Sequence, residues 1–122
     1  MNSVENDMSS TRSKIDKIKE KLIEFRDKGN SEDWLIEVRS HKQIKLWQRA
    51  TRELGFHDQT PYTQRVVAQD FNFKDGDYAE HVGKDFYPRG IKIYMYIYNR
   101  GGSVGVDVSN HTMAIGTKIV TL

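Results

Sequence analysis

The chain has 122 residues, of which 37% are hydrophobic and 30% charged, and these values with a net charge of +2 predict one soluble globular domain. Because the chain has no cysteine, a disulfide scaffold, a thiolate nucleophile and a cysteine-ligated zinc site are excluded, and a reducing, cytoplasmic setting is favoured. We find no signal-peptide pattern and no apolar run near the ~20 residues that span a bilayer, so no membrane partner is expected. Residues 12–53 carry an excess of positive charge, whereas residues 54–122 are balanced, which favours an anionic partner for the first half.

The first predicted helix follows a polar, aperiodic segment. Residues 1–11 are predicted to be a flexible tail, which leaves 12–122 as a single domain. From about residue 13 to residue 28, apolar side chains recur at helical spacing and form one narrow stripe. These are Ile15, Ile18, Leu22 and Phe25. Such a stripe fits a helix laid on one surface or a short coiled-coil seam, so a homodimer stays open.

The next segment, 32–39, is too short for its periodicity to distinguish a helix from a strand. Its apolar residues are Trp34, Leu35, Ile36 and Val38. Ser31 is a good helix N-cap and two acidic residues follow it, so the sequence favours a short helix.

A clearer helix is predicted from Ser40 to Leu54. Ser40 and Gln43 form a capping box, and Gly55 stands where a left-handed residue ends a helix. Opposite the apolar side of this helix lie four cations, Lys42, Lys45, Arg49 and Arg52. This basic face is a candidate for binding nucleic-acid phosphates, although any surface helix has a solvated charged face.

The middle of the chain is predicted as a loop (57–64), a strand (65–73) and a turn (74–77), with 78–90 left unassigned. Acids and one histidine gather between positions 75 and 85. They are Asp75, Asp77, Glu80, His81 and Asp85. A metal-dependent nuclease would use such ligands, but Asp-Gly-Asp is usually just a turn, so no metal or cofactor is expected.

Residues 91–98 alternate with the period of a strand. One face carries Ile91, Ile93, Met95 and Ile97, and the other carries Lys92, Tyr94, Tyr96 and Tyr98. A hairpin at 99–103 then leads into an aliphatic strand over 104–108, and a last strand is predicted over 112–121. If these strands form a meander, Gly105 and Lys118 border the tyrosines.

Two or three helices thus precede about four strands with short connections. This order predicts an α+β fold in which the N-terminal helices pack on one face of a C-terminal antiparallel sheet. The aliphatic rows of the strands should form the core beneath the helices.

The tyrosine row allows three interpretations: it packs within this chain or its dimer, it binds a protein partner, or it stacks nucleobases. We find no nucleophile elbow, phosphate-binding glycine loop or paired histidines at helical spacing, so no enzymatic activity is expected. The sequence therefore predicts a small protein-binding module of the inhibitor, immunity or adaptor type. Nucleic-acid binding through the basic helix is the alternative, and a metal-dependent nuclease is the second alternative.

Overall fold

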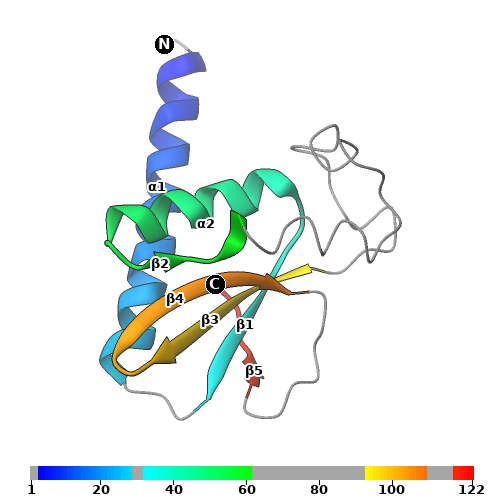
Figure 1. Cartoon of the computed structure of the whole chain (residues 1–122). Helices are drawn as coiled ribbons and strands as arrows, with labels where there is room; N and C mark the ends of the chain where they lie inside the picture. The colour runs from blue at the N-terminus through cyan, green and yellow to red at the C-terminus, as the bar shows by residue number, and fades with distance from the viewer. Residues whose placement is uncertain (1–2, 29–31, 62–92, 110–116) are drawn as a thin grey trace.

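The computed structural model describes residues 3–28, 32–61, 93–109 and 117–122, and in this part of the chain two helices cover one face of a five-stranded sheet (Figure 1). The helices are α1 (Ser3–Lys28) and α2 (His41–Glu53). The strands are β1 (Asp33–Val38), β2 (His57–Asp58), β3 (Ile93–Arg100), β4 (Ser103–Ser109) and β5 (Thr117–Ile119). Their order across the sheet is β2-β4-β3-β1-β5. The predicted α+β class is confirmed.

The segment 33–38 is a strand, so the sequence-based preference for a short helix was wrong. Trp34, Ile36 and Val38 are buried on the helix side of the sheet, and Leu35 is only 1% exposed on the other side. A strand that is buried on both faces has apolar residues at nearly every position, so its sequence lacks the alternation of apolar and polar residues by which a strand is recognised. Pairing with β3 and β5 on either side therefore decides the conformation of β1.

The sheet is mixed rather than antiparallel, which corrects the predicted meander. β1 is antiparallel to β3 but parallel to β5, and β2 inside the predicted loop pairs in parallel with β4. The chain therefore places β5 beside β1 instead of beside β4. Lys118 is aligned with Trp34, so it lies on the helix side and does not border the tyrosines.

The β3–β4 hairpin agrees with its prediction. Gly101 and Gly102 form the turn with φ of 60° and 90°, and the positive values at both positions are those a type I′ turn requires. The Asn99 side chain accepts a hydrogen bond from the backbone N–H of Gly102 at 2.9 Å. The turn sets the register in which Tyr98 is aligned with Gly105.

The core lies between the helices and the aliphatic face of the sheet, as predicted. All four residues of the predicted α1 stripe are buried, and Phe25 meets Trp34 edge to face at 5.2 Å. From α2 the core receives Ile44, Trp47 and Ala50, and from β3 and β4 it receives Ile93, Met95, Ile97, Val104, Val106 and Val108.

The predicted ends of α2 agree with the structure, whereas the predicted start of α1 does not. The N-cap of α2 is Ser40, whose Oγ accepts from the Gln43 N–H, and Gly55 has φ 71° beyond the C-cap. By contrast α1 begins at Ser3, so most of the segment predicted as a flexible tail is helical. Within the described residues, no helix is long and apolar enough to cross a membrane.

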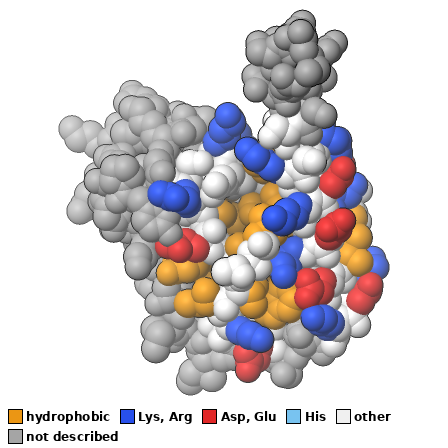
Figure 2. Space-filling model, turned by 180° about the vertical axis from the view of Figure 1, so that it is seen from behind, with side chains coloured by type: hydrophobic (Ala, Val, Ile, Leu, Met, Phe, Trp, Pro, Cys, Tyr) orange, Lys and Arg blue, Asp and Glu red, His pale blue; other side chains and the backbone are white. Residues whose placement is uncertain are grey.

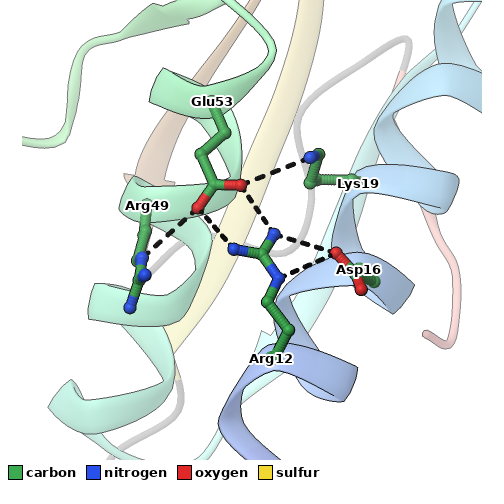
Figure 3. Close-up of polar contacts among 5 residues, drawn as sticks. All are labelled: Arg12, Asp16, Lys19, Arg49 and Glu53. Carbon is green, nitrogen blue, oxygen red and sulfur yellow. Dashed lines mark hydrogen bonds and ion pairs between the residues drawn. The ribbon is translucent and has the colours of Figure 1, made fainter. Parts of the chain in front are cut away.

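Charged side chains join α1 to α2 (Figure 3). The guanidinium of Arg12 donates to both oxygens of Glu53, with the shorter contact at 2.6 Å, and also to Asp16 at 2.8 Å. Lys19 and Arg49 each reach Glu53 at 3.3 Å. The hydrogen bond from Arg12, and after it the one from Lys19, lower the pKa of Glu53 to about 2. The network joins α1 to α2 at their exposed surface.

Candidate functional site

The predicted tyrosine row lies on β3, on the side of the sheet away from the helices, and its members differ in exposure. Tyr94 is 6% exposed, whereas Tyr96 and Tyr98 are half-buried. Burial raises the pKa of the Tyr94 phenol, and the charge of Glu37 raises it further. Lys92 and Ile91 lie outside the described residues. A partner on this side would therefore reach Tyr96 and Tyr98 rather than Tyr94.

Tyr96 is held by two charged residues from different parts of the chain. Its hydroxyl donates to a carboxylate oxygen of Asp33 on β1 and accepts from Nη2 of Arg100 at 3.3 Å. Arg100 also lies 4.0 Å from the same carboxylate. Burial and the bond to Asp33 raise the pKa of Tyr96, so this phenol stays protonated and acts as a donor at neutral pH.

Tyr98 is fixed by contacts on both sides of its ring. A Cβ added to Gly105 would lie 2.5 Å from ring atoms of Tyr98, so the ring rests directly on the glycine backbone. The Tyr96 ring stacks beside it, with centroids 5.5 Å apart, and the Arg100 guanidinium lies 5.3 Å from the Tyr98 centroid. We call Asp33, Tyr96, Tyr98 and Arg100 the tyrosine surface.

An exposed apolar residue at the edge of the sheet lies on the same face as the tyrosine surface, separated from it by the buried Leu35. Leu35 is aligned with Tyr96 on one side and with Ile119 on the other, so all three lie on the same face. Two strand spacings separate Tyr96 from Ile119, which is about 10 Å. Ile119 is 56% exposed, one of the two large hydrophobic residues that the described chain exposes strongly.

The predicted basic face of α2 is solvent-exposed along its length. However, Arg49 contacts Glu53 at 3.3 Å and Arg52 lies 3.7 Å from Asp58. Lys42 and Lys45 have no ion pair or hydrogen bond through their side chains in the described part of the chain. Of the four cations of this face, only Lys42 and Lys45 are thus free of an ion pair within the described chain and able to bind an anion from outside it.

The residues of the proposed metal site, Asp75, Asp77, Glu80, His81 and Asp85, lie outside the described residues. The predicted strand 65–73, the turn after it and residues 112–116 of the last strand do as well. Among residues 3–28, 32–61, 93–109 and 117–122, no three metal-ligating side chains gather at one point.

Sequence reasoning missed Asp33, Arg100 and Ile119. Arg100 could have been found, because strand alternation continued from Tyr98 by two residues places it on the same face. Asp33 and Ile119 join the face only through strand pairings that connect distant parts of the chain. Protein-family models, curated protein sequences and solved structures yield no match to this chain.

Proposed function

We propose that the protein is a non-enzymatic binding module, of the inhibitor, immunity or adaptor type, that captures a protein partner through the tyrosine surface and Ile119. The observation that carries the proposal is the stacked pair of half-buried tyrosines, Tyr96 and Tyr98, with Arg100 over it. Because it has no cysteine, we place the protein in the cytoplasm.

The composition of this surface supports a protein partner. Tyrosine and arginine are, with tryptophan, the residue types enriched among those that dominate binding energy in protein interfaces. An exposed isoleucine about 10 Å away extends the apolar area beyond the rings. Asp33 and Arg100 supply one charge of each sign beside the rings, which gives a partner polar contacts that set its orientation.

The rigidity of the pair also supports binding. Side chains that are free before binding lose ~0.5–1.5 kcal/mol each when a partner immobilises them. Tyr96 is already fixed by Asp33 and Arg100, and Tyr98 by Gly105 and the neighbouring ring. These two side chains therefore lose little further conformational entropy when a partner binds.

The test compares Tyr96→Ala with Tyr94→Phe as a matched control. Immobilised protein is incubated with nuclease-treated native lysate, and captured proteins are compared between variants. We expect Tyr96→Ala to unfold ~1–3 kcal/mol more easily, yet stay folded and lose the captured protein, because only the ring contacts and one hydrogen bond disappear. Tyr94→Phe should keep it, because only 6% of Tyr94 is exposed to a partner.

Capture that survives Tyr96→Ala would disprove this use of the surface. If the captured protein is the chain itself, sedimentation of the purified protein should show a concentration-dependent dimer that Tyr96→Ala abolishes. That result would assign the surface to self-association.

Nucleic-acid binding through α2 is the second candidate, and the two unpaired lysines Lys42 and Lys45 favour it. Affinity for DNA that rests on phosphate contacts falls steeply with salt. Lys45→Ala should reduce both the affinity and its dependence on salt, whereas Tyr96→Ala should change neither. Unchanged affinity in Lys45→Ala would dismiss this candidate.

A further inference from the structure

A hollow of about 720 Å³ opens on the helix side of the molecule, where α1, the first turn of α2 and the end of β1 meet. Figure 2 shows this face, with hydrophobic side chains between surrounding lysine and arginine side chains. The size lies within the ~300–1,000 Å³ usual for small-molecule sites. It lies across the sheet from the tyrosine surface and is independent of it.

The rim of the hollow is positive. Lys14 and Lys17 come from α1, Lys42 from α2, and Arg39 from the link between β1 and α2. Glu37 is the one acidic residue among the described lining residues. Positive charges from separate elements are therefore brought together around one opening.

The lysines of this rim differ from the neighbouring cations of α1 in having no carboxylate partner among the described residues. On α1, Arg12, Lys19 and Lys28 all contact carboxylates at 2.6–3.3 Å. Lys14 and Lys17, which lie on the same helix, have no such partner in the described part of the chain, and neither has Lys42. Like charges three residues apart on a helix repel each other, so an anion between these lysines would be stabilised.

The start of α2 adds to the positive potential. Ser40 and Gln43 line the hollow, which places the positive end of the helix dipole at its wall. Acidic residues commonly balance this end of a helix, but α2 has none in its first turn and has Lys42 instead. The start of α2 and the lysines thus both favour a negatively charged ligand.

The floor of the hollow is apolar. The buried Ile18, Ile36 and Trp47 line it, and the accessible apolar side chains are the half-buried Leu46 and Leu122, which is 45% exposed. A bare inorganic anion would leave this floor uncovered. A ligand that joins one anionic group to an apolar body would match both the floor and the rim.

We propose that this hollow binds a small amphipathic anion, whose carboxylate or phosphate lies among Lys14, Lys17, Lys42 and the start of α2 while its apolar body covers Leu46. A concave site bounded by three elements suits a compact ligand better than an extended nucleic-acid backbone. Lys42, which belongs to both the hollow and the basic face of α2, would then contact a small molecule rather than nucleic-acid phosphates.

The test is titration calorimetry of the full chain with four probes below their micellar concentrations: decanoate, decyl phosphate, inorganic phosphate and decyltrimethylammonium. We expect saturable one-to-one binding of at least one anionic amphiphile, and the stronger of the two identifies the preferred head group. Inorganic phosphate should bind at least tenfold more weakly, and the cationic amphiphile should not bind. Equal binding of the cationic and anionic amphiphiles, or no saturable binding, would overturn the proposal.

Matched variants test the position of the site. Lys17→Gln and Lys42→Gln should each weaken binding several-fold, because each removes one positive charge from the rim. Lys45→Gln is the control, since it makes the same change on the exposed side of α2 outside the hollow. Circular dichroism checks that all three variants fold. If Lys45→Gln weakens binding as much as Lys42→Gln, the attraction is diffuse and the hollow is not the site.

Discussion

Gly105 determines where the Tyr98 ring lies, because only a residue without a side chain lets the ring pack directly against the backbone of β4. In Gly105→Ala the new methyl group would lie 2.5 Å from ring atoms, so the ring must swing away and lose its contacts with Tyr96 and Arg100. We expect the free energy of unfolding to fall by ~1–3 kcal/mol, the usual cost of overpacking.

A double-mutant cycle measured by urea denaturation checks this prediction. In a Tyr98→Ala background the methyl group has no ring to displace, so Gly105→Ala should become neutral or stabilise by up to ~1 kcal/mol through the lost freedom of the unfolded chain. An equal penalty in both backgrounds would show that the ring is not what requires glycine at this position.

At this scale the sequence placed side chains on the correct face but not at the correct depth. Period-two alternation put Tyr94, Tyr96 and Tyr98 together and set Gly105 beside them, as the register confirms. It could not separate Tyr94, at 6% exposure, from its two half-buried neighbours. The burial of each side chain depends on what covers the strand, and the alternation of residue types along the strand contains no such information.

At the scale of elements, Glu53 connects α1 to α2, and its titration should appear in the stability of the protein. A pKa lowered from 4.5 to about 2 means that the ionised form stabilises the folded state. This contribution is fully present above the unfolded pKa and is lost as the pH falls from 4.5 through about 2. Screening by salt should reduce it, because the network is partly exposed.

The variant Glu53→Gln should therefore lower the melting temperature by a few degrees at pH 7 and approach the wild type near pH 2. Thermal unfolding between pH 2 and pH 7 at low salt measures this. Glu20→Gln is the matched control, because Glu20 is an exposed acid on α1 without a side-chain partner in the described chain. A constant difference across the pH range would mean that the Glu53 carboxylate contributes through packing rather than charge.

Elements with strong local signals were predicted closely, and those fixed by distant partners were not. The capping residues Ser40 and Gly55 located α2 almost to the residue, and two glycines located the β3–β4 turn. In contrast β1 has no terminal signal in its own sequence and gains its conformation from strands on both sides. The same reason explains why β5 was assigned the wrong neighbour.

At the scale of the whole molecule, the sheet separates two surfaces with different chemistry. The helix side contains the core, and the hollow lined by Lys14, Lys17 and Lys42 opens on that side. The other side carries the tyrosine surface. The sequence predicted which face the helices cover, because the aliphatic rows are local patterns. It could not predict the hollow, because Lys14 and Lys17 meet Lys42 only after α1 and α2 pack against each other.

The same arrangement predicts how stability is distributed along the chain. β3 has a paired strand on each side and β1 does as well, so their amides exchange with solvent only through large openings. The first turns of α1 extend beyond α2 (Figure 1), and Ile15 is the first buried side chain described on this helix. Backbone hydrogen bonds in 3–10 should therefore open far more often than those in 15–25.

Native-state hydrogen exchange, followed by mass spectrometry of peptic peptides, tests this distribution within a single helix. Peptides from residues 3–10 should exchange at least a hundredfold faster than those from 15–25, because the latter carry the buried stripe that packs on the sheet. Peptides from β1 and β3 should be the slowest and should track global unfolding in denaturant. Uniform protection along α1 would instead require that its first turns be held by contacts as extensive as those of Ile15 and Leu22, and the helix would then be one cooperative unit.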